Sequence, residues 1–143
     1  LDSNTTMSKV VSTYHRECAL FSTKIIIEKI EKFATENNKK VLFVLSYPAG
    51  YLAQAHEENL RWDQSIIDFI TSKKLPLVDL GQAHFNEYKQ FNIEFKDYLA
   101  KYFIGHYNPL GNMFCAQACS GKLIEMLNPK PAPYNDGTKL GSF

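Results

Sequence analysis

Apolar residues recur at a helical spacing early in the chain, once a polar start has been passed. Residues 1–12 are polar without a clear period and are expected to be irregular. From about residue 13 to residue 37, apolar side chains return at steps of three and four, which predicts an amphipathic helix. Its apolar positions include Ala19, Ile26, Ile30 and Phe33.

Two short apolar runs follow and predict strands. Residues 41–45, Val-Leu-Phe-Val-Leu, are continuously apolar, which is typical of a strand buried on both faces in a parallel sheet covered by helices. Residues 75–80 predict a second strand, which Gly81 closes. Between these runs, an apolar stripe predicts one helix over about residues 55–72. The order strand, helix, strand indicates one right-handed crossover unit.

The remaining chain is predicted to be largely helical. Residues 83–103 mix aromatic and charged side chains and are expected to be helical in part, although residues 91–95 could be extended. A helix is predicted over residues 109–127. Residues 128–143 hold several prolines and glycines, a composition typical of an irregular strap or a disordered end.

The pattern predicts a single α/β domain over residues 1–143, with no internal repeat or low-complexity tract. Two parallel strands make a sheet too small for a usual free-standing α/β domain. Either further strands escape the pattern, or the chain is part of a larger doubly wound domain. The other part would then be an earlier segment or a partner subunit. A sheet cut open in this way would favour self-association.

Composition and charge exclude several classes of function. The hydrophobic fraction is 45% and the formal net charge is +1, and no basic tract is interleaved with aromatics, so no nucleic-acid partner is expected. No apolar run is long enough to span a bilayer. Three cysteines cannot all pair with one another, and Cys18, Cys115 and Cys119 are expected to be small buried core residues.

Residues 105–112, Gly-His-Tyr-Asn-Pro-Leu-Gly-Asn, carry the strongest chemical signal. Asn108 suits the N-cap of a helix and Pro109 suits its first turn. Gly111 allows the new helix to lie close to a neighbour. His106 is therefore expected just outside a rigid helix, where its imidazole can face a cleft and act as a general base. The competing interpretation is a polar loop residue that packs near the helix start.

The succession of residues 41–45, Ser46-Tyr47-Pro48, residues 77–80 and residues 105–112 resembles the C-terminal half of the SGNH hydrolases, also called GDSL esterases. The resemblance covers about residues 39–127. It implies a three-layer α/β/α flavodoxin-like fold, present here as a partial domain with few parallel strands. It also implies hydrolysis of small esters or of acylated carbohydrates or lipids, with no metal or organic cofactor. His106 matches the catalytic base of that family.

Other family features are missing from this sequence. The family places an aspartate two or three residues before the histidine, where this chain has Ile104 and Phe103. The segment around Ser3 lacks the strand and the glycine that precede the family's nucleophile, and the glycine-asparagine block of the oxyanion hole has no counterpart. The favoured function is therefore the C-terminal portion of a serine esterase whose nucleophile lies outside this chain.

Two alternatives remain open from the sequence. The first is a non-catalytic binding or assembly domain that keeps the fold without a complete triad. The second, weaker, is a flavodoxin-type nucleotide-binding protein. Residues 47–50 would have to bind its phosphate, and with one glycine and one proline they are poorly suited to do so through backbone N–H groups.

Other polar residues have structural explanations. Asp79 is expected to cap a helix rather than to line a cleft. Ser46 lacks the glycine-flanked turn of a nucleophile elbow. His56 lacks the second histidine of a zincin motif, and His15 and His84 are expected to be surface or satisfied positions. Trp62 and the aromatic residues between positions 85 and 103 are expected to serve core packing.

Overall fold

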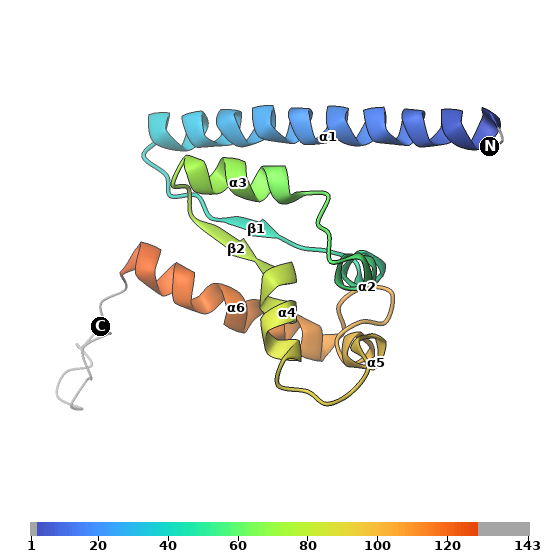
Figure 1. The fold of residues 1–143 in the computed structure, drawn as a ribbon. Coiled ribbons are helices and arrows are strands. Elements are labelled where there is room, and N and C mark those ends of the chain that lie inside the picture. The colour runs from blue at the N-terminus through green and yellow to red at the C-terminus, as the bar shows by residue number, and fades with distance from the viewer. Residues whose placement is uncertain (1–2, 129–143) are drawn as a thin grey trace, which may run out of the picture.

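A computed structural model describes residues 3–128, and the chain is mostly helical around a small parallel sheet (Figure 1). In chain order the elements are α1 (Ser3–Glu36), β1 (Phe43–Leu45), α2 (Ala49–Glu58), α3 (Gln64–Ser72), β2 (Leu77–Asp79), α4 (Leu80–Tyr88), α5 (Phe95–Ala100) and α6 (Pro109–Leu127). The fold is thus loosely α/β, as predicted. The predicted tail, apart from Asn128, lies outside the described residues.

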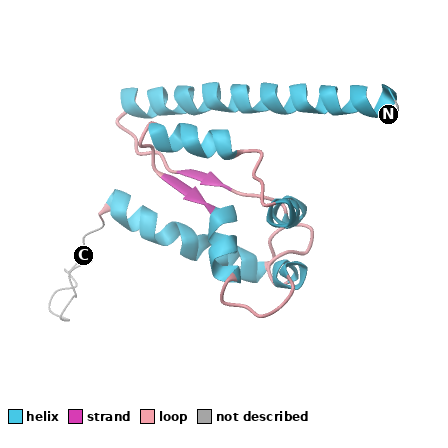
Figure 2. Cartoon of the chain, in the orientation of Figure 1, coloured by secondary structure: helices cyan, strands magenta, loops and turns pink. Residues whose placement is uncertain are grey.

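The two predicted strands pair in parallel, with Val44 opposite Val78 (Figure 2). One face of the sheet packs on α1 and α3, and α6 packs along β2 on the other face. The predicted burial of the first strand on both faces is wrong, because Val44 is 43% exposed while Val78 is 9% exposed. The reason is that α6 covers β2 but leaves the adjacent face of β1 open.

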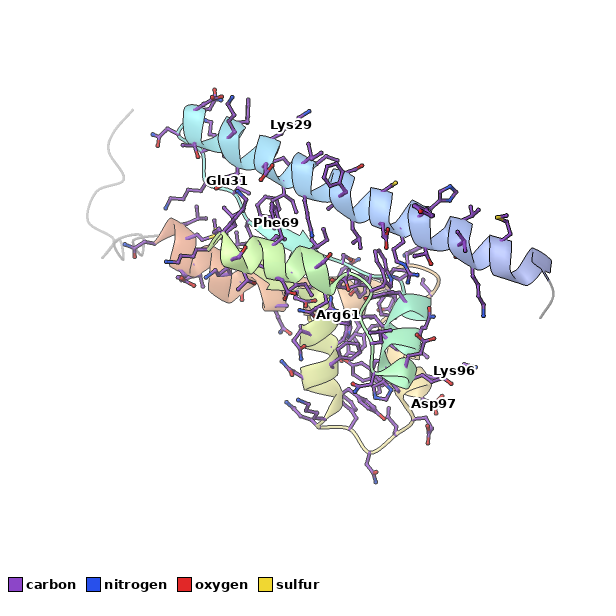
Figure 3. The ribbon with its side chains drawn as sticks, turned by 45° about the horizontal axis from the view of Figure 1, so that its top comes forward. Lys29, Glu31, Arg61, Phe69, Lys96 and Asp97 are labelled. Carbon is purple, nitrogen blue, oxygen red and sulfur yellow. The ribbon has the colours of Figure 1, made fainter. Side chains whose placement is uncertain are left out.

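The first helix begins earlier than the sequence pattern predicts, so the expectation of an irregular segment over residues 1–12 is wrong from Ser3 onward. No glycine or proline interrupts residues 3–36, and hydroxyl groups such as that of Ser12 bond back to helix carbonyls. The C-terminal half of α1 packs on α3, where Lys73 pairs with Glu31 at 3.1 Å beside Phe69 (Figure 3). The N-terminal half projects beyond the rest of the molecule (Figure 1).

The single helix predicted over residues 55–72 is in fact two helices, α2 and α3. Asn59 ends α2 in the left-handed conformation, with φ of 49°, and its N–H bonds to the carbonyl of Ala55. Asparagine tolerates this conformation better than most residues, and the apolar spacing does not register such a break. The break brings the side chains of Arg61 and Asp63 inward beside the strand ends, whereas Leu60 and Trp62 stay exposed.

An aromatic core holds α2, α4, α5 and the start of α6 together. Its buried members are Leu52, Phe95, Tyr98, Leu99, Tyr102 and Phe103. The predicted packing role of these aromatic residues is confirmed, whereas Trp62 is 44% exposed. Residues 91–94 form a loop, not a strand.

The start of α6 is built as the sequence predicts. The side chain of Asn108 accepts a hydrogen bond from the N–H of Gly111 at 2.9 Å, and Pro109 occupies the first turn. A Cβ atom at Gly111 would lie 2.4 Å from the carbonyl oxygen of Tyr102, so only glycine permits this approach. The helix start is thereby fixed against the segment that precedes the His106 turn.

Candidate functional site

His106 lies on a tight, exposed turn between α5 and α6. Phe103 and Tyr107 form an isolated antiparallel bridge across the turn, and the N–H of Ile104 donates to the carbonyl of His106 at 2.8 Å. Gly105 has a φ of +93°, a conformation that favours glycine. The backbone of the turn is therefore held on both sides while the imidazole faces solvent.

The hydrogen bond of the imidazole determines its tautomer. Nδ1 of His106 lies 2.8 Å from the carbonyl oxygen of Tyr107, which can only accept. Nδ1 therefore carries the proton in the neutral ring, and Nε2 presents a lone pair outward. This arrangement suits a general base. A carbonyl stands where a carboxylate orients the histidine of a complete triad, so the tautomer is fixed without a full negative charge.

A groove of about 560 Å³ runs between α2 and α5 and reaches the His106 turn at Gly105. Its walls are largely apolar, with Ala53 and Leu99 on facing helices and Phe103 near the turn. Lys96 of α5 is among the charged residues that line it (Figure 3). The groove offers apolar surface next to the segment that carries the candidate base.

A second cluster of polar side chains lies at the carboxyl ends of the two strands. Arg61, from the loop between α2 and α3 (Figure 3), binds Asp63 through Nε at 3.2 Å and Nη2 at 2.9 Å. Its Nη1 binds Asp79, the last residue of β2, at 2.5 Å. Tyr47 and Tyr51 donate to the two carboxylate oxygens of Asp63 at 2.6 and 2.5 Å.

This Arg61 cluster, made of Arg61, Asp63, Asp79, Tyr47 and Tyr51, is internally satisfied. Burial alone would raise the pKa of Asp63, but the hydrogen bonds from Arg61 and the two tyrosines hold it below its usual range. Burial and the bond to Asp63 raise the pKa of Tyr51 to about 12. Asp79 also accepts the N–H of Gln82 at 3.1 Å, so its predicted capping role is confirmed. The cluster therefore ties the strand ends together.

Sequence reasoning missed this cluster because it placed Arg61 and Asp63 inside a continuous helix. The signal that could have found them is Asn59, a common helix-ending residue, followed at once by an arginine and an aspartate. Such a pair in a loop is free to reach the carboxyl ends of neighbouring strands.

His84 lies at the centre of a buried chain of hydrogen bonds. Tyr98 donates to Glu87 at 2.7 Å, so its oxygen accepts the Nδ1 proton of His84 at 2.9 Å. Nε2 of His84 then accepts the hydroxyl of Tyr107 at 3.0 Å. The expectation of a satisfied histidine is confirmed, because both ring nitrogens have partners and the residue is fully buried.

Acid is expected to destabilise the protein through His84. Burial lowers its pKa from 6.5 to about 4, although Glu87 acts in the opposite sense. The unfolded chain therefore binds this proton first, and the free energy of unfolding falls by about 3 kcal/mol as the pH drops from the ordinary histidine pKa to the folded value. Urea titrations at a series of pH values measure the loss. The His84→Gln variant should lose that component of the pH dependence, and an identical pH profile would contradict the assignment.

The remaining candidate residues are scattered. Cys18 is exposed, and Cys115 and Cys119 are half-buried, so the prediction of three buried cysteines is wrong. Cys18 lies in the N-terminal half of α1, where its side chain is exposed. Ser46 is exposed directly after β1. No group of three or more potential metal ligands occurs within residues 3–128.

In comparisons with known proteins, no family model, no curated protein and no solved structure matched the chain. Within the described residues, none of the helices is both long enough and apolar enough to cross a membrane.

Proposed function

We propose that about residues 39–127 form the C-terminal half of an SGNH-type serine ester hydrolase with a three-layer α/β/α domain, in which His106 is the general base. One observation carries the proposal. His106 sits on a braced turn with Nδ1 bound to a carbonyl and Nε2 open to solvent, which is the state a base requires.

The position of the turn supports a role at the ligand-binding edge of the sheet. Open parallel sheets bind ligands at the carboxyl ends of their strands. Tyr107, which directly follows His106, bonds through its hydroxyl to His84 of α4, the helix that begins at the carboxyl end of β2. The candidate base is therefore next to a residue that is bonded to the helix starting at that edge.

The sheet supports the proposal of a divided domain. Within residues 3–128 it has two strands, so each strand keeps one edge without a strand partner. Val44 is 43% exposed although the sequence around it is typical of a fully covered strand. Additional parallel strands from a segment outside this chain would pair with these edges, and the helices that connect such strands would cover this face.

The chemistry follows from the tautomer of His106. A serine hydroxyl on the additional segment gives its proton to Nε2 while its oxygen bonds to the ester carbonyl carbon. The imidazolium then returns the proton to the leaving alkoxide as the ester bond breaks, which leaves an acyl-serine. Water then gives a proton to the same Nε2 as its oxygen bonds to the acyl carbon, and the imidazolium returns that proton to the serine oxygen as the acyl–serine bond breaks, which releases the acid. The Tyr107 carbonyl holds the ring throughout, although it stabilises the imidazolium less than a carboxylate would.

The groove beside the turn favours esters with an apolar acyl group. Its apolar walls extend from Gly105 between α2 and α5, and its volume of about 560 Å³ is ample for a short or medium acyl chain. Acylated lipids and carbohydrates with such chains are the substrate class we propose.

Ester hydrolysis and serine labelling test the proposal. The complete gene product should hydrolyse p-nitrophenyl esters and react with a fluorophosphonate at a serine outside residues 1–143, whereas this chain alone should do neither. Labelling of a serine within this chain would support an esterase but refute the divided domain. A complete gene product that neither hydrolyses esters nor reacts with the probe would refute catalysis.

A non-catalytic assembly domain is the second candidate, favoured by the carbonyl that replaces a carboxylate beside His106. The preceding part of the gene product distinguishes the two. A Gly-Asp-Ser block after a strand, followed by a Gly-x-Asn-Asp block, would be inconsistent with the assembly domain.

A further inference from the structure

The long helix α1 carries an apolar seam that nothing within the described residues covers. The seam, which we call the α1 seam, consists of Met7, Val11, Tyr14, Cys18, Phe21 and Ile25. These residues lie on the side of the helix opposite Ile27 and Ala34, which are buried. The helix therefore has two apolar faces, one used by the fold and one free.

The exposure of the seam is large for a folded protein. Met7, Tyr14 and Phe21 are each 65% exposed, and Val11 is 44% exposed. The N-terminal half of α1 extends past the other elements, so the seam is accessible along its length (Figure 1). Contiguous exposed apolar surface of this kind marks an interaction site.

The spacing of the seam indicates what covers it. Its members follow one another at steps of four, three, four, three and four residues, which is the heptad pattern of a coiled coil. Val11, Cys18 and Ile25 take the a positions, and Met7, Tyr14 and Phe21 take the d positions. A seam that repeats every 3.5 residues matches another helix rather than a sheet or a flat surface.

We infer that two copies of this chain associate through their α1 seams as an antiparallel helix pair. In that orientation each a residue faces a d residue of the second copy. Large side chains then meet smaller ones, with Tyr14 against Cys18 and Phe21 against Val11. Met7 meets Ile25. A two-fold axis near residue 16 relates the two helices, so the same surface of each copy forms the two sides of the interface.

A parallel pair of the same helices fits less well. In register it stacks Tyr14 on Tyr14 and Phe21 on Phe21, while Val11 and Cys18 face their own small counterparts and leave gaps. It also brings Lys24 of each copy beside Lys29 of the other, which gives two repulsive pairs. In the antiparallel pair, the only residues of like charge that come together are the Glu17 side chains of the two copies, which meet at the two-fold axis.

The area is sufficient for a stable dimer. Each exposed aromatic ring of the seam can bury about 150 Å², and the four rings of two copies supply about half of the roughly 1,200 Å² at which specific interfaces begin. The aliphatic and sulfur-containing members of both seams supply the rest. The inference is independent of the proposed ester hydrolysis, because α1 lies outside residues 39–127.

Sedimentation of the chain tests the dimer. We expect a monomer–dimer equilibrium that Tyr14→Glu or Phe21→Glu shifts to monomer, with unchanged helical circular dichroism from the rest of the fold. Ile26→Glu is the matched control, since Ile26 is 54% exposed on the same helix but lies off the seam. A chain that is monomeric at all concentrations, or that stays dimeric in both glutamate variants, would overturn the inference. So would a monomer that co-sediments with phosphatidylglycerol vesicles through this seam.

Thiol oxidation tests the orientation. In a background of Cys115→Ser and Cys119→Ser, Cys18 faces Tyr14 of the second copy and should give little disulfide-linked dimer with copper phenanthroline and oxygen as the oxidant. Tyr14→Cys in that background supplies a facing thiol and should give efficient cross-linking between copies. Efficient cross-linking through Cys18 alone would indicate the parallel pair and refute the antiparallel one.

Discussion

His106→Ala is expected to lower kcat for ester hydrolysis by the complete gene product about 100- to 10,000-fold, the contribution typical of a general base. The reason is that Nε2 is the proton acceptor of the proposed reaction, and alanine leaves none at this position. KM should change much less, because the imidazole contributes to proton transfer rather than to binding of the acyl group. Steady-state kinetics on p-nitrophenyl butyrate measure both constants.

Two further variants make the test of His106 specific. His106→Asn keeps a side-chain N–H that can donate to the Tyr107 carbonyl but cannot act as a base, so its kcat should fall as far as that of the alanine variant. His15→Ala removes an exposed histidine of α1, far along the chain from the turn, and should leave kcat unchanged. If His106→Asn retained full activity, the turn would have a structural role only.

Arg61→Ala is expected to lower the free energy of unfolding by about 3–5 kcal/mol, the range for breaking one side of a buried ion pair. Arg61 is 12% exposed and binds Asp63 and Asp79, which are 7% and 14% exposed in their side chains. Without the guanidinium, two carboxylates remain close together with little water to solvate them. Urea denaturation followed by circular dichroism gives the free energy of unfolding.

Graded variants show which property of Arg61 matters. Arg61→Lys keeps the charge but cannot form the paired bonds to Asp63, so an intermediate loss is expected. Tyr51→Phe removes one of several hydrogen bonds to Asp63 and should cost about 1 kcal/mol. If Arg61→Ala lowered the free energy of unfolding by less than Tyr51→Phe does, the cluster would be solvated and would contribute little to stability.

Local sequence signals predicted the elements that depend on short-range geometry. The strand around Val44, the strand around Val78 and the helix that starts at Pro109 all lie where the pattern placed them. Asn108 marks the start of α6 through a side-chain cap that operates within one helical turn, whereas Gly111 marks a close approach to Tyr102 in the preceding segment. The candidate base, His106, was likewise found from its immediate neighbours.

Errors arose where an element depends on what surrounds it. The pattern joined α2 and α3 because apolar spacing continues across Asn59, although one residue in the left-handed conformation ends the helix. It predicted a fully covered first strand because apolar content indicates where a residue tends to go, not whether a neighbour is there to cover it. It began α1 late because residues 3–12 hold few apolar side chains, and the step from Met7 to Val11 shows a helical period only together with the seam residues that follow.

The sequence by itself determined the two parallel strands, the start of α6 and the place of His106 outside it, because each follows from the preferences of adjacent residues. Only the tertiary structure decided that a backbone carbonyl orients the imidazole, that Arg61 joins the two strand ends, and that His84 is neutral within a buried chain. The first of these bonds joins adjacent residues but depends on the turn that the Phe103–Tyr107 bridge holds. The other bonds join residues distant in sequence, so they depend on where the chain crosses itself. No local spacing contains that information.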